Sequence, residues 1–128
     1  MNLLLPLRTL FVNQTLIKVK KIITDDPNSF VLLSDRDKNA ETLLKLGFMP
    51  KNAIDELLSL TALDYVKGPE DNTSESGPRK GEIWKFGKVI NGIEVYIKIH
   101  LVPTKKNTQC LCISFHESAY PLHYPLKK

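Results

Sequence analysis

The chain of 128 residues contains no run of about 18 apolar residues, which is the length that a membrane-spanning helix needs. It is also poor in cysteine, and its only two cysteines, Cys110 and Cys112, cannot supply a disulfide framework. The apolar start, MNLLLPLRTLFV, has neither a basic leading region nor a small-residue cleavage site, which argues against a signal peptide. These absences predict a cytoplasmic protein that does not associate with membranes.

The composition that remains is typical of a soluble globular protein, with 42% hydrophobic and 25% charged residues. The length predicts a single domain, 1–128, with a hydrophobic core of its own. We interpret residues 1–13 as a leading strand, a loose tail or an extension. Residues 68–81, rich in Gly, Pro, Ser and acidic side chains, are predicted to form a mobile loop.

The first half of the chain has the periodicity of helices. Apolar residues at helical spacing predict helices over 14–24, 37–46 and 50–60, while 30–33 is either a strand or the lead-in to the second helix. The second helix is expected to bury Ala40, Leu43, Leu44 and Leu46. Because helices are concentrated in the first half and strands in the second, the predicted fold class is α+β, and the C-terminal strands are expected to form a three-stranded meander.

The clearest turn signal is Asn91-Gly92, which favours a two-residue hairpin loop. Such a loop fixes the register of the two flanking strands and pairs Lys85 with Lys98 and Gly87 with Tyr96. Side chains alternate between the faces of a strand. The residues expected on the core face are Trp84, Phe86, Val95, Ile97 and Ile99, and those on the opposite face are Lys85, Tyr96, Lys98 and His100.

A third strand is predicted over 109–117, with a loop at 103–108 before it. If its apolar residues Leu111, Ile113 and Phe115 join the core face, Tyr96 lies opposite His116, Lys98 opposite Ser114, and His100 opposite Cys112. A zinc site of Cys110, Cys112 and His116 is a minor alternative, but the chain lacks a second Cys/His pair at ligand spacing. We therefore expect neither a metal nor another cofactor. Residues 120–128 contain two prolines and are predicted to pack as an extended tail anchored by Tyr120 and Tyr124.

Charge is distributed unevenly along the chain. Between 79 and 106 there are seven Lys or Arg residues (79, 80, 85, 88, 98, 105 and 106) against two Glu (82 and 94). A basic sheet indicates a polyanionic partner such as RNA, although a solvated surface gives the same pattern. The residues assigned to substrate binding are Lys88 and Arg79, which belong to this basic stretch, and His100 and Ser114, which belong to the polar face of the predicted meander.

Three segments resemble the MqsR-like toxins of bacterial toxin–antitoxin pairs. These are Asp64-Tyr-Val-Lys67 after a helix, a Trp84-containing strand followed by Val95-Tyr-Ile-Lys-Ile99, and the closing Ile113-Ser-Phe-His116. The resemblance implies a RelE-like fold, in which the N-terminal helices pack on one face of a curved antiparallel sheet. It also implies an endoribonuclease that cleaves mRNA without a metal, inhibits translation and growth, and is silenced by an antitoxin protein. It leaves open whether the ribosome takes part. It also implies that Lys67, Lys85, Tyr96 and His116 form the site, although the family prototype has Gln and Lys at the positions aligned with Lys85 and His116.

Metal-free RNA cleavage needs a base, an acid and cations. His116 suits proton transfer, and Lys67, Lys85 and Lys98 suit phosphate binding. Three roles are open to Tyr96: it would orient the phosphate, stack a base, or donate a proton if the lysines lowered its pKa. Each residue also has an ordinary structural interpretation, as a surface lysine or a core aromatic. Two other functions therefore stay open: a non-catalytic RNA-binding module, and a protein-interaction subunit that receives a partner strand at its sheet edge.

Overall fold

A computed structural model describes residues 4–71 and 81–127 of the chain. Three α-helices precede most of the sheet: α1 (Leu4–Asp25), α2 (Asp37–Leu46) and α3 (Pro50–Leu58). The strands are β1 (Phe30–Leu32), β2 (Tyr65–Asp71), β3 (Glu82–Ile90), β4 (Ile93–Pro103) and β5 (Thr108–Glu117). Short 3₁₀ turns, Pro27–Ser29 and Ala62–Asp64, lead into β1 and β2. The fold is therefore α+β, as the sequence predicts.

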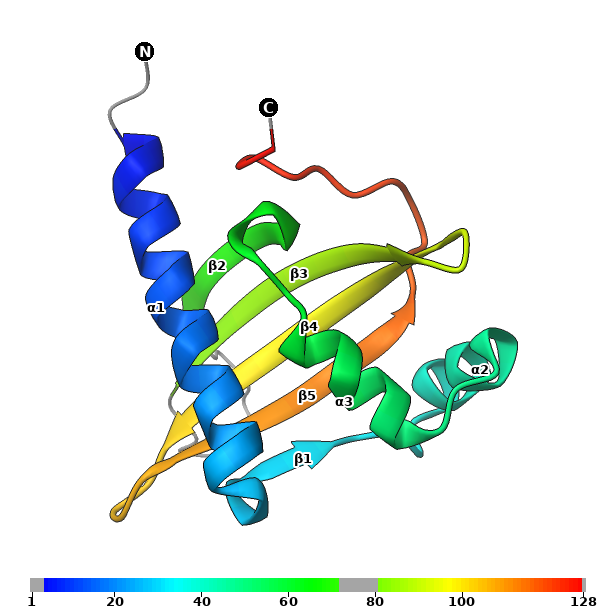
Figure 1. Cartoon of the computed structure of the whole chain (residues 1–128), viewed down its shortest axis with the longest axis horizontal. Coiled ribbons are helices and arrows are strands. Elements are labelled where there is room, and N and C mark those ends of the chain that lie inside the picture. The colour runs from blue at the N-terminus through cyan, green and yellow to red at the C-terminus, as the bar shows by residue number, and fades with distance from the viewer. Residues whose placement is uncertain (1–3, 72–80, 128) are drawn as a thin grey trace.

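The five strands form one sheet in the order β1-β5-β4-β3-β2 (Figure 1). The pairs β2–β3, β3–β4 and β4–β5 are antiparallel, whereas β1 lies parallel to β5. The prediction of an antiparallel sheet is thus wrong for this edge, and the sheet is mixed. The reason is that β1 is not joined to its neighbour by a hairpin. It lies at the edge of the sheet beside β5, the last strand of the chain, and runs in the same direction.

Helices α1 and α3 cross one face of the sheet (Figure 1). Their buried side chains, Val12, Leu16, Val19, Ala53 and Leu57, pack in one cluster with those of the strands. Helix α1 begins at Leu4, so the predicted start at residue 14 is wrong, and 4–13 is neither a strand nor a loose tail. The apolar stripe in fact extends N-terminally to Val12, which is 0% exposed.

Along 4–71 and 81–127, no helix combines the length and the apolar character that crossing a membrane requires.

Helix α2 lies at the sheet edge beside β5 and buries a different stripe from the predicted one. Leu43 and Leu46 are buried as expected, but Ala40 is exposed and Leu44 is 84% exposed. Two polar residues, Asn39 and Thr42, are buried in their place. Hydrophobic periodicity could not find this orientation, because the stripe is fixed by hydrogen bonds to β5.

The register worked out from Asn91-Gly92 matches the structure pair for pair, from Ile90 with Ile93 to Trp84 with Ile99. The β4–β5 register also places Tyr96 opposite His116 and Lys98 opposite Ser114. It then shifts at a bulge, so that Cys112 pairs with Ile99 and His100 pairs with Leu111. The predicted pairing of His100 with Cys112 is therefore wrong.

The bulge also changes which side chains of β5 enter the core. Cys110 and Cys112 are fully buried there with Phe115, while Leu111 and Ile113, which were predicted to be core residues, are only half-buried. An extra residue in one strand reverses the alternation on one side of it.

The prediction of a loop at 68–81 is wrong over 68–71, which belongs to β2. Residues 72–80 lie outside the described residues.

Candidate functional site

The sheet face opposite α1 and α3, called the outer face below, carries the predicted site. Alternation along β3, β4 and β5 places Lys85, Tyr96, Lys98 and His116 on this face. The rings of Tyr96 and His116 lie 5.5 Å apart between centroids and are tilted by 50°. Lys85 and Lys98 are directly paired, as the hairpin register predicts. Four chemically active side chains from three strands are therefore brought together.

Strand β2 adds Lys67, which pairs with Lys85 in the register of the sheet. It also adds Glu70, which sequence reasoning missed. The carboxylate of Glu70 lies 2.8 Å from the Lys85 Nζ and 3.3 Å from the Lys67 Nζ. Lys85 lowers the pKa of Glu70 by its hydrogen bond, and Glu70 in return raises the pKa of Lys85. One carboxylate thus forms ion pairs with both lysines and holds them together.

The sequence gives little signal for Glu70, because an acidic residue among Gly, Pro and Asp is typical of a loop. The β2–β3 pairing contains two register shifts, and Glu70 pairs with Ile83, two residues before Lys85 on β3. Such shifts depend on tertiary packing and cannot be derived from alternation.

Tyr96 is half-buried, and burial raises the pKa of its hydroxyl more than the nearby Lys85 lowers it. A pKa lowered by the lysines, which was the condition set for Tyr96 as a proton donor, is therefore not found. The hydroxyl remains protonated at neutral pH and can donate a hydrogen bond to an anion. It is not pre-ionised.

His116 is held by a contact of 3.0 Å between its Nδ1 and the backbone oxygen of Glu117. A carbonyl oxygen can only accept, so this contact favours the tautomer with the proton on Nδ1. In neutral His116 the lone pair then resides on Nε2, which can accept a proton. Hollows of about 320 and 470 Å³ are both lined by His116, so the ring is accessible to a ligand.

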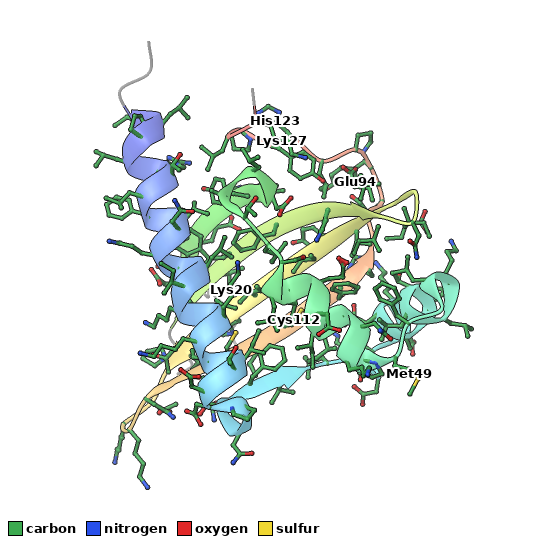
Figure 2. The ribbon with its side chains drawn as sticks, in the orientation of Figure 1. Lys20, Met49, Glu94, Cys112, His123 and Lys127 are labelled. Atoms are coloured by element: carbon green, nitrogen blue, oxygen red, sulfur yellow. The ribbon has the colours of Figure 1, made fainter. Side chains whose placement is uncertain are left out.

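The C-terminal segment forms one wall of the outer face. Glu94 accepts hydrogen bonds from the Leu122 amide (3.0 Å) and the Tyr124 hydroxyl (2.8 Å), and Figure 2 labels Glu94 beside this segment. Gly87 lets the segment approach, since a Cβ there would lie 2.5 Å from Leu122. Tyr124 is an anchor as predicted. Tyr120 is not, because it is 73% exposed, but it is close enough to influence the pKa values of Lys85 and Tyr96.

Of the remaining predicted residues, Ser114 lies opposite Lys98 as expected and lines a hollow together with His116. Lys88 lies on the helix-bearing face, where it forms an ion pair with Glu56 (3.0 Å) and a hydrogen bond with Ser59. His100 is 4% and Ser114 9% exposed. Arg79 lies outside the described residues. The site is thus centred on Tyr96 and His116, and Lys88 does not reach it.

The two cysteines are free thiols on the core side of β5, whereas His116 is on the outer face. Burial raises the pKa of the Cys110 thiol to about 12 and also raises that of Cys112. Within 4–71 and 81–127, no three His, Cys, Asp or Glu side chains are grouped as metal ligands would be.

Comparison of the chain with protein-family models, with curated proteins and with solved structures found no match in any of the three.

Proposed function

We propose that the protein is an endoribonuclease that cleaves mRNA without a metal, with the outer face as its active site. The observation that carries the proposal is the Tyr96–His116 ring contact of 5.5 Å, flanked by the paired Lys85 and Lys98. A proton acceptor, a hydroxyl donor and two cations thus converge where a phosphodiester can lie. Lys98 supports a phosphate-binding role, because Glu70 offsets the charges of Lys85 and Lys67 whereas no ion pair in the described part of the chain involves Lys98.

The proposed reaction begins with attack of the ribose 2′-OH on the adjacent phosphorus. His116 Nε2 takes the 2′-OH proton, and the 5′-oxygen of the next nucleotide leaves, which gives a 2′,3′-cyclic phosphate and a 5′-hydroxyl. Lys85, Lys98 and Lys67 stabilise the negative charge that develops on the phosphate oxygens. Tyr96, protonated at neutral pH, donates its hydroxyl proton to the leaving 5′-oxygen, and the proton that His116 took from the 2′-OH then restores the Tyr96 hydroxyl.

The resemblance to MqsR-like toxins adds the biological setting to this proposal. The protein would be the toxin of a toxin–antitoxin pair in the cytoplasm, with a RelE-like fold, and an antitoxin protein would silence it. The mixed α+β sheet is compatible with that fold. Expression without the antitoxin would then arrest bacterial growth.

The test compares the purified wild-type protein with His116→Ala and with the control His123→Ala. His123 lies in the exposed part of the C-terminal segment, away from β5 (Figure 2). In EDTA, wild type and His123→Ala should cleave labelled mRNA, and His116→Ala should be slower by about 100- to 10,000-fold. Induced expression of wild type and of His123→Ala should arrest bacterial growth, and expression of His116→Ala should not. Intact RNA after incubation with wild type would reject the proposal, and RNA binding without cleavage would favour a binding module.

A further inference from the structure

Two hollows flank His116 on the side where β5 meets α2. One, of about 470 Å³, is lined by Arg36, Asp37 and Lys38 together with Ser114. The other, of about 320 Å³, is lined by Lys38, Glu41, Lys45 and Glu117. His116 and Lys38 belong to the lining of both, so the hollows adjoin. A ligand that reaches His116 from the outer face therefore meets α2 directly.

Helix α2 is held against β5 by hydrogen bonds between its side chains and backbone groups that would otherwise pair with a neighbouring strand. The Asn39 amide donates to the backbone oxygens of Leu33 (2.8 Å) and Ile113 (2.9 Å), and its oxygen accepts from the Phe115 amide (3.0 Å). Thr42 accepts from the Glu117 amide at 2.8 Å. A site built between such fixed elements is preorganised, which a binding function requires.

The charges of the two hollows differ. Arg36 and Lys38 are exposed, and no ion pair within the described part of the chain involves either of them. Among the described residues, Asp37 is the single carboxylate that lines their hollow, so the basic side chains there are in excess. In the other hollow Lys45 is already bound to the Oε1 of Glu117 at 2.7 Å, which leaves the second oxygen of Glu117 and the carboxylate of Glu41 as acceptors.

We propose that these hollows hold the nucleotide next to the cleaved phosphate, with a phosphate on Arg36 and Lys38 and the base against Glu41 and Glu117. This inference rests on the proposed function, because His116 marks where the RNA is cleaved. The planar guanidinium of Arg36 matches a phosphate, and Lys38 adds a point charge between the hollows. Carboxylate oxygens accept hydrogen bonds from the amino group of cytosine, which uracil lacks, so the subsite selects amino-bearing bases.

The experiment measures binding separately from cleavage. Fluorescence anisotropy in EDTA, in the His116→Ala background that prevents cleavage, gives the affinity for labelled oligo(C) and oligo(U) of equal length. Arg36→Ala/Lys38→Ala should weaken binding of both about tenfold and reduce the salt slope by about 0.7 for each lost phosphate contact. The matched control, Lys51→Ala, removes an exposed lysine of α3 and should change neither.

The base assignment has its own variant. Glu41→Gln keeps the size of the side chain, and Glu41 is not the partner of Lys45 in its ion pair. The parent protein should prefer oligo(C) over oligo(U) by at least about fivefold, and Glu41→Gln should reduce that preference. Equal affinities for the two oligonucleotides in the parent protein would overturn the base assignment.

The outcomes separate this subsite from the nuclease activity. Cleavage by wild type together with equal binding by the double variant and Lys51→Ala would overturn the subsite alone. Binding that depends on Arg36 and Lys38, in a protein that leaves RNA intact, would support the subsite and reject the nuclease. Absence of any RNA binding would overturn both.

Discussion

Asn39 connects the helix layer to the strand that carries His116, and its removal tests that connection. The side chain is 1% exposed and makes three hydrogen bonds to backbone atoms of Leu33, Ile113 and Phe115. Each bond contributes about 1 kcal/mol net, and truncation leaves one buried and two part-buried backbone groups without this partner. Asn39→Ala should therefore lower the free energy of unfolding by about 3 kcal/mol, which corresponds to a decrease in Tm of about 10 °C.

A second substitution at the same position sharpens the test. Asn39→Asp keeps the acceptor for Phe115 but replaces two N–H donors with an oxygen that faces two carbonyls. It should destabilise at least as much as Asn39→Ala at neutral pH. Its deficit relative to wild type should shrink in acid, because a protonated carboxyl regains one donor.

Urea unfolding followed by circular dichroism measures both variants. The control is Asn52→Ala on α3, which loses one exposed bond from the Met49 amide at 2.8 Å and should cost less than about 1 kcal/mol. If Asn39→Ala costs no more than this control, the reasoning that Asn39 fastens α2 to β5 is refuted.

Three further predictions concern the outer face and the core. Glu70→Gln frees Lys67 and Lys85, so RNA affinity by anisotropy should rise about 1.5- to 5-fold, the range expected for a surface ion pair; unchanged affinity would show that these lysines do not contact phosphate. The pKa of Glu70 is lowered from 4.5, so its ion pairs stabilise the fold above that value and lose this effect as pH falls through the lowered pKa. Urea titrations at about pH 6 and pH 3 should show wild type losing more stability than Glu70→Gln, and equal losses would contradict this. Cys110 and Cys112 are 0% exposed with raised pKa values, so a thiol reagent at pH 8 should label them only after unfolding, and rapid labelling of the native protein would be inconsistent with their burial.

The central register could be predicted from sequence because one turn determines it. Asn91 and Gly92 both have positive φ, 51° and 79°, and this conformation fixes every pair from Ile90–Ile93 back to Lys85–Lys98. Local chemistry thus placed Tyr96, Lys98 and Lys85 on one face. The predicted register of β5 with β4 is confirmed only from Ser114 to His116. Beyond Ser114 it is wrong, because the hydrophobic pattern does not indicate the bulge at Ile113.

Other parts of the site depend on contacts between distant segments. The parallel position of β1 next to β5 and the buried polar stripe of α2 arise from hydrogen bonds that periodicity does not report. Lys88 shares the alternation phase of Trp84 and Phe86, so the register itself places it on the helix face, against its assignment to substrate binding. The assignment of Lys88 to substrate binding relied on the density of basic residues along the chain, which does not distinguish the two faces of the sheet.

The most direct test of the central claim is the chemistry of the RNA ends that the protein produces in EDTA. Attack by the 2′-OH predicts a 2′,3′-cyclic phosphate and a 5′-hydroxyl, and it predicts that a single 2′-deoxy substitution at the cleaved nucleotide abolishes cleavage. These ends should form with wild type and be reduced about 100- to 10,000-fold with His116→Ala. Products with 5′-phosphate ends, or cleavage that persists at the deoxy position, would contradict the account.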